Sequence, residues 1–497
     1  MTDPDSTPAS DRDSSPPSTA STPSTASPVG PQAVRSLGRE RLAGRIRRFD
    51  RKHRFDRTLA DVVSRLTGRA LGPYQSAIIR IGFAGTWLFF LLRELPHRQE
   101  MYGPDGPWSW DLAQQLTANN HAFTVLVWAD SQVWFEFVFA LAVLSSALLL
   151  LGWRTRTMSV LFLIGVLSLQ NRSIFMGDGG DNVIHLMAIY LVFTRCGQVW
   201  SLDARRERRS RPDATRDLDP YPDLDPDPAP DRVGVVLWAV LGLVLAAATL
   251  AGKIDGGLFG GWRTVYWGLW AVQGLWWLAG RYTRSVQPRV LLDVVANLVH
   301  NAALFVIMAE ACLIYATAGW YKVQGSRWQD GTAVYYPLHL DYFSPWPGLS
   351  GLLAASGTMV TVVTYGTVIA QVAFPFTLFN RRVKNVLLAA MMTEHAVIAV
   401  VLGLPFFSLA MIAADAVFLP TSFLRRLGDR VTRARDRLFT GLSSRLRRTL
   451  PGWRKESSRP LESDPEAAPE SDPETDPDAG PDAGPDAAGH PHVGFTT

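Results

Sequence analysis

The sequence predicts an all-α fold, a polytopic membrane helical bundle of about ten transmembrane helices with basic amphipathic surface helices and disordered tails. Three observations lead to this prediction. Of the 497 residues, 47% are hydrophobic, with 17 Trp and 24 Phe, but mean hydropathy is only +0.06, because polar ends dilute an apolar middle. Apolar runs long enough to cross a bilayer recur along that middle. Short clusters of Lys and Arg flank these runs.

Charge and cysteine content narrow the class further. The net charge of +4 comes from basic clusters beside apolar runs, which indicates membrane topology rather than nucleic-acid binding. The lipid bilayer is therefore the expected partner. The two cysteines, Cys196 and Cys312, both fall in predicted spans, so neither a disulfide framework nor a metal site is expected.

The two ends of the chain are expected to lie outside the bundle. Residues 1–35 are rich in Ser, Thr and Pro, and 457–497 repeat Asp-Pro units; neither can bury enough apolar surface to fold, so both should be disordered. Residues 36–72 and 421–456 are dense in Arg with apolar residues at helical spacing. These two segments are predicted to be basic amphipathic helices on the membrane surface.

A transmembrane domain is predicted between residues 73 and 420, with an insertion near 204–290. Its spans are expected, to within roughly four residues, at 77–95, 132–151, 157–174, 184–200, 233–252, 262–280, 298–319, 359–379, 386–403 and 406–420.

The positive-inside rule orients these spans. The Arg-rich start puts the N-terminus in the cytoplasm, and every second loop is then basic. Both termini are therefore predicted to be cytoplasmic, in a multi-pass protein of the plasma membrane. The loops predicted to lie outside are 96–131, 175–183, 253–261 and 320–358.

The first candidate site lies at the outer end of the predicted span 298–319. Lys322 follows Ala318-Gly319 and precedes a polar, aromatic loop that contains Trp328 and His339. An amine near an apolar boundary can lose its proton and act as a base. The alternative is that Lys322 anchors the span at the interface, with Trp328 in the aromatic belt.

A second candidate site is the glycine-rich outer loop 175–183. Glycines permit close approach of a ligand to the backbone, and carboxylates accept hydrogen bonds or protons. The alternative is a turn in which Asp181 or Asn182 caps the following helix. The residues proposed for a substrate or headgroup pocket here are Arg172, Asp178, Asp181 and Asn182, with His185 as a catalytic candidate.

A third candidate group lies inside the spans, where charged side chains are costly and therefore suggest function. Glu394 and His395 are adjacent in one span, so at least one must face the protein interior, and His395 is a catalytic candidate. The alternative is a polar network that stabilises the bundle. Further embedded polar residues are Arg80, Glu136, His300, Glu310, Gln371 and Asp415.

Two short segments resemble a known family. Residues 318–331, AGWYKVQGSRWQDG, are similar to the segment of vitamin K-dependent gamma-glutamyl carboxylase that contains its catalytic base lysine, with a one-residue difference in spacing. Trp200-Ser201-Leu202-Asp203 resembles a Trp-Ser-Val-Asp segment of the same enzyme. The chain is on this basis identified as a member of the horizontally transferred transmembrane (HTTM) family, which includes microbial relatives of the carboxylase.

The resemblance implies a membrane enzyme that acts on a peptide or lipid at the outer face. Lys322 would be its base and would deprotonate a quinone-like lipid cofactor in its hydroquinone form. The carboxylase has an Asn-Asn-His segment where this chain has Asp181-Asn182 without a directly following histidine. Only a basic segment and an acidic tail follow Pro420, where the carboxylase has a large extramembrane domain that grips its protein substrate, so vitamin K-dependent carboxylation itself is not expected.

Two other functions remain open at this point. By analogy with HTTM relatives of a sporulation-delaying protein, the chain would be a non-catalytic maturation, export or immunity factor with an exported peptide as its partner. Alternatively, the embedded Glu and His groups would form the proton path of a small-molecule transporter.

Overall fold

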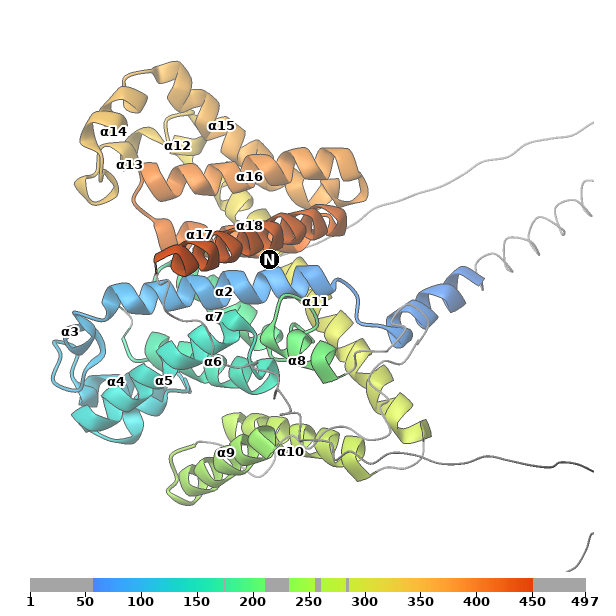
Figure 1. Cartoon of the computed structure of the whole chain (residues 1–497). Coiled ribbons are helices and arrows are strands. Elements are labelled where there is room, and N and C mark those ends of the chain that lie inside the picture. Colours follow the sequence, from blue (N-terminus) through green and yellow to red (C-terminus); the bar gives the residue numbers. More distant parts are fainter. Residues whose placement is uncertain (1–56, 174, 211–231, 255–260, 283–285, 450–497) are drawn as a thin grey trace, which may run out of the picture. The chain divides into compact units, whose positions relative to one another are not determined.

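The computed structural model describes residues 57–173, 175–210, 232–254, 261–282 and 286–449, and Figure 1 shows their arrangement. All regular elements in these ranges are helices, which confirms the all-α prediction. Within the described ranges, six helices are long and apolar enough to cross a membrane, or seven if a bent pair near residue 420 counts as one span. About ten spans therefore remains a prediction. The predicted disordered tails 1–35 and 457–497 lie outside the described residues.

Each of the ten predicted spans overlaps a helix, but α6 has only 16 residues and α7 only 13. The predicted span 184–200 continues past the end of α7 at Leu191. The longer elements are α2 (Pro73–Glu94), α4 (Trp110–Asn119), α5 (Gln132–Leu151), α6 (Thr155–Gln170), α7 (Gly179–Leu191), α8 (Leu202–Ser210), α9 (Arg232–Leu250), α10 (Gly261–Tyr282), α11 (Val286–Gln324), α14 (Pro347–Ala354), α15 (Gly357–Ala373), α16 (Arg381–Val401), α17 (Pro405–Asp415) and α18 (Thr421–Thr449). Short elements are α3 (Arg98–Tyr102), η1 (Val125–Trp128), α12 (Ser326–Gln329), α13 (Tyr335–Leu338), η2 (Asp341–Phe343), η3 (Phe374–Phe379) and η4 (Ala416–Phe418).

Helix α2 is the most buried of the candidate spans and packs against α5, α7 and α17. Its buried side chains include Phe83, Trp87 and Leu91. Gly82 allows α17 to approach closely, because a Cβ atom at that position would lie 2.5 Å from the Cβ atom of Ala413. Close packing of such large side chains stabilises a helix pair through many dispersion contacts.

A buried arginine on α2 satisfies backbone groups of two other segments. The guanidinium of Arg80 donates to the carbonyls of Leu149 and Leu150, which end α5, and to those of Cys196 and Trp200 after α7. Helix C-terminal carbonyls lack intrahelical partners, and the fork of an arginine supplies several donors at once. This embedded charge therefore has a structural role.

The Trp-Ser-Leu-Asp segment places Asp203 at the N-terminus of α6. Its carboxylate accepts hydrogen bonds from the backbone N–H groups of Arg154 (2.9 Å) and Thr155 (2.8 Å), and from the Thr155 hydroxyl. Arg154 has φ 49°, so it cannot continue a helix toward its own N-terminal side. Asp203 thus caps α6 from a position 49 residues away in the chain.

Helix α11 has 39 residues and begins well before the predicted span at 298. Its first half carries polar side chains that hold other segments. His300 accepts a hydrogen bond from the Arg195 backbone N–H and faces the carbonyl of Leu71, while Asn301 donates to two carbonyls of residues 57–70. Arg195 in turn pairs with Asp293 at 2.7 Å. The embedded His300 is therefore fully used in packing.

Helices α9 and α10 are joined by a pair of stacked tryptophan side chains. The rings of Trp238 and Trp270 stack with centroids 4.3 Å apart, and each indole N–H donates to the other residue's carbonyl. Gly242 and Gly274 make room for these rings, because a Cβ atom at either glycine would lie within 2.7 Å of the opposing indole. Residues 232–254 and 261–282 of the insertion near 204–290 therefore form a pair of packed helices.

The described residues up to Arg430 belong to one compact unit. The second unit is Val431–Thr497, described only as far as Thr449, where α18 ends. Of the first amphipathic segment, 36–72, the part up to residue 56 lies outside the described ranges, and residues 57–68 are helical.

Candidate functional site

Lys322 heads a chain of hydrogen bonds between three helices. Its Nζ atom donates to Oε1 of Gln371 on α15 at 2.7 Å. The Nε2 atom of Gln371 then donates to Oε1 of Glu394 on α16 at 3.0 Å. The Gln371 amide thus connects the amine and the carboxylate without direct contact between them. A single proton shared by the Lys322 amine and the Glu394 carboxylate leaves this pair with no net charge wherever the proton resides, which suits a partly buried site.

Two features of the Ala-Gly-Trp-Tyr-Lys segment position the amine. A Cβ atom at Gly319 would lie 2.6 Å from the side chain of Val372, so glycine lets α11 and α15 approach closely where Lys322 meets Gln371. Trp328, on α12, covers the other side of the amine, with Nζ 5.2 Å from its ring centroid. This is a cation–π distance, and it joins two residues that the sequence analysis placed in the same site.

His395 belongs to a neighbouring buried cluster. Its Nε2 atom lies 3.1 Å from the Tyr315 hydroxyl of α11, and its ring packs 5.6 Å from that of Phe407 on α17. Asp415 is fully buried and interacts electrostatically with Tyr315 and Glu394, although neither of its oxygens has hydrogen-bond geometry with a described residue. The charge of Lys322 also acts on His395, so the two clusters are neighbours.

The glycine-rich loop has the structure of a helix cap. Asp178 is the N-cap of α7, where its carboxylate accepts from the N–H groups of Gly180 and Asp181, and the Asp181 carboxylate accepts from the Asp178 N–H. This reciprocal capping box is the turn alternative, with Asp178 in place of Asp181 or Asn182 as the cap. Asp181 is 4% exposed, and burial raises its pKa to about 7.

Arg172 is buried and holds a loop rather than facing an open cavity. Its guanidinium donates to the Gly103 carbonyl at 2.8 Å and to that of Ser109 at 3.5 Å. These contacts hold residues 103–109 in place. Asn182 is exposed and His185 half-buried on α7, while exposed His339 packs against Tyr335, with ring centroids 4.0 Å apart.

The structure therefore unites some predicted site residues and separates others. Lys322 and Trp328 are in contact, and His395 lies in the adjoining cluster. Phe407 lies between the 178–182 loop and His395: a Cβ atom at Gly180 would lie 2.6 Å from the Phe407 backbone, and the His395 ring packs against the Phe407 ring.

Two contributors were not identified as partners from the sequence. Gln371 was one of several embedded polar residues, and Tyr315 was not singled out because an aromatic residue in an apolar run carries no signal of its own. Their link to Lys322 and His395 depends on which faces of α11, α15 and α16 meet. Glu136 pairs instead with Arg98 at 2.9 Å. No family model, curated protein or solved structure matches the chain.

Proposed function

We propose that this chain is a multi-pass membrane protein of the HTTM type, in the plasma membrane with both termini cytoplasmic, and that Lys322 accepts a proton from a hydroquinone-like lipid at the outer face. In this proposal it is a carboxylase-like membrane enzyme that acts on a peptide or lipid. The observation that carries the proposal is the hydrogen-bond chain from Lys322 through Gln371 to Glu394.

The hydrogen bonds from Lys322 through Gln371 to Glu394 give Lys322 what a general base needs. A base must be held in place and must be able to shed its own proton between turnovers. Gln371 fixes the amine through one hydrogen bond, and its link to Glu394 offers a carboxylate that balances the ammonium charge after proton uptake. An interfacial anchor needs neither partner, since water and headgroups satisfy a snorkelling lysine.

The residues around Lys322 suit a flat aromatic lipid. Trp328 already covers the amine, and on α11 the side chains of Trp320 and Tyr321 are 64% and 73% exposed. These rings would hold a quinone ring by stacking. A reduced quinone supplies a phenolic hydroxyl, whose proton is the one that Lys322 would take.

A proton-coupled transporter is the second candidate function. Buried Asp415 and the His395–Tyr315 pair extend the titratable groups beyond Glu394, and embedded carboxylates and histidines mark proton relays in transporters. This reading makes Glu394 and Asp415 essential and assigns no role to a bound quinone.

Lipid co-purification tests the enzyme proposal. The wild type, Lys322→Ala and Lys253→Ala would be purified in mild detergent and their bound lipids identified by mass spectrometry. Lys253 is the matched control, because it is an exposed lysine on the same predicted outer face. We expect a quinone bound to the wild type and to Lys253→Ala, and lost from Lys322→Ala. Identical phospholipids without quinone in all three would reduce Lys322 to an interfacial anchor and favour a transporter or a peptide-processing factor.

A further inference from the structure

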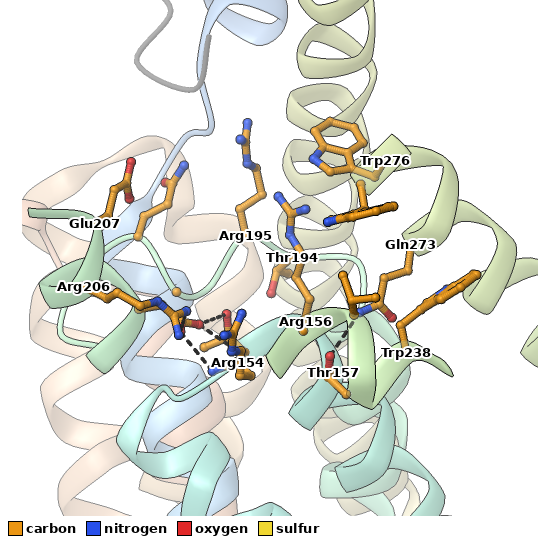
Figure 2. Close-up of a pocket in the computed structure, with 17 residues that line it drawn as sticks. Arg154, Arg156, Thr157, Thr194, Arg195, Arg206, Glu207, Trp238, Gln273 and Trp276 are labelled. Atoms are coloured by element: carbon orange, nitrogen blue, oxygen red, sulfur yellow. Dashed lines mark hydrogen bonds and ion pairs between the residues drawn. The ribbon is translucent and has the colours of Figure 1, made fainter. Parts of the chain in front are cut away.

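A pocket of about 330 Å³ lies between the α9–α10 hairpin and the ends of α6, α7 and α8. None of its lining residues comes from α11, α15 or α16, the helices that carry the hydrogen bonds of Lys322. Figure 2 shows arginines from the α6–α8 side facing a wall of α10 that carries Gln273 and Trp276.

One wall of the pocket is strongly basic. Four arginines line it, Arg154, Arg156, Arg195 and Arg206, against two carboxylates, those of Asp203 and Glu207. Asp203 is already engaged: it caps α6 and pairs with Arg206 at 2.7 Å. The lining thus holds four guanidinium groups and two carboxylates, and a third carboxylate, that of Asp293 on α11, pairs with Arg195. A guanidinium group has five N–H donors, so an arginine in an ion pair can still donate to a further anion. Guanidinium groups bind phosphate oxygens in a bidentate manner.

The facing wall is aromatic and continues into an apolar surface. Trp238, Trp276 and Trp277 line the pocket, and the Arg156 guanidinium lies 5.1 Å above the ring of Trp276. The hydrogen bond from Gln273 to Thr157, 3.0 Å, joins the two walls. Next to the pocket, the outward side chains of the hairpin are exposed and apolar, among them Val236, Val240, Val272 and Leu275.

We propose that this pocket binds the phosphate headgroup of an anionic phospholipid, with its acyl chains along the apolar face of α9 and α10. Basic pockets between helices at the cytoplasmic end of a bundle bind such headgroups, and the positive-inside pattern predicts that Arg154 and Arg206 lie at that end. Tryptophan rings at this level fit the boundary between headgroup and acyl chain. The inference rests on the proposed membrane insertion and orientation, and not on the chemistry of Lys322.

The test is a lipid titration of the purified full-length chain in nonionic detergent, followed by thermal unfolding and native mass spectrometry. The probes are dioleoyl phosphatidylglycerol, dioleoyl phosphatidylcholine and inorganic phosphate. The variants are Arg156→Gln combined with Arg206→Gln, and Arg156→Lys, which keeps the charge. Arg205→Gln is the matched control, because Arg205 is exposed on α8 and does not line the pocket.

We expect phosphatidylglycerol, and not phosphatidylcholine, to bind and stabilise the wild type and Arg205→Gln. The double variant should bind it at least about tenfold more weakly, since each charge-assisted hydrogen bond contributes on the order of a tenfold change in affinity. Arg156→Lys should retain part of the binding. Unfolding without added lipid should be the same for all, which shows that the variants fold. Equal binding of both lipids, unchanged affinity of the double variant, or equal stabilisation by inorganic phosphate alone would overturn the assignment.

Discussion

Lys322 and Gln371, 49 positions apart in the chain, are joined by a hydrogen bond of 2.7 Å between Nζ and Oε1. The bond exists because Gly319 lets α11 and α15 approach. It orients the Gln371 amide so that its Nε2 atom faces Glu394. Loss of either end of this chain leaves a buried polar group without its partner, which gives the first prediction.

Gln371→Met should destabilise the protein by about 1–3 kcal/mol, the usual cost of leaving buried polar groups unsatisfied. The measurement is a double-mutant cycle with Lys322→Met, read from thermal unfolding in detergent. Residues in direct contact give non-additive effects, so the double variant should be less destabilised than the sum of the single variants. Additive effects would show that the hydrogen bond between Lys322 and Gln371 does not contribute to stability.

Arg80→Met should be among the most damaging single changes, because it removes the guanidinium group that donates to four backbone carbonyls. We expect a loss of at least about 3 kcal/mol, seen as loss of monodisperse protein in size-exclusion chromatography. Arg80→Lys should not restore the wild-type state, since a lysine cannot match the guanidinium fork. Arg65→Met, a change to an exposed arginine, is the control. A stable Arg80→Met protein would contradict the structural role of the Arg80 hydrogen bonds.

Asp203→Ala should cost about 1–2 kcal/mol through the loss of the α6 cap. Thermal unfolding would measure the effect, with Asp105→Ala in an exposed loop as the control. Asp203→Asn should lose less than Asp203→Ala, because asparagine is a good N-cap residue. If alanine and asparagine behaved alike, capping would not be the role of this residue.

Asp181 predicts a pH dependence of stability. Burial is the main cause that raises its pKa from the ordinary aspartate value of 3.8 to about 7, so between these pH values the folded state holds a proton that the unfolded state has released. The stability that protonated Asp181 contributes is therefore fully present below about pH 4 and is lost as the pH rises toward 7.

Thermal unfolding of the wild type and Asp181→Asn between pH 5 and 8 would test this, since each pKa unit corresponds to about 1.4 kcal/mol. The unfolding temperature of the wild type should fall over this range relative to that of the variant. Asparagine can still accept the Asp178 N–H bond, so the capping box is kept. Parallel curves for the two proteins would rule out a raised pKa at Asp181.

The helical class and the approximate positions of the apolar helices could be predicted from the sequence, because apolar runs and basic flanks are local signals. The start of α11 at Val286, before the predicted span 298–319, could not, since Asp293 and Asn297 interrupt the apolar pattern and their partner Arg195 lies far away in the sequence. The role of Asp203 as the cap of α6 could likewise not be predicted from the sequence. Its motif was visible, but its partners on α6 lie 49 residues earlier.

Part of the candidate site followed from the sequence as well. Lys322 and Trp328 are near in sequence and meet in the structure. The partners Gln371 and Glu394 depend on which faces of three helices meet, which no local pattern encodes. The basic pocket could not be predicted for another reason. In the sequence its arginines indicate only membrane topology, and the pocket that they line also needs side chains of α9 and α10.

The central claim is that Lys322 takes a proton from a hydroquinone-like lipid. The most direct measurement is the ultraviolet absorbance of a short-chain quinol added anaerobically to the protein in nanodiscs, because the deprotonated quinol absorbs at longer wavelength than the neutral form. The account predicts that the quinolate band appears with the wild type and Lys253→Ala and is absent with Lys322→Met. A band of equal strength in all three, or in none, would contradict it.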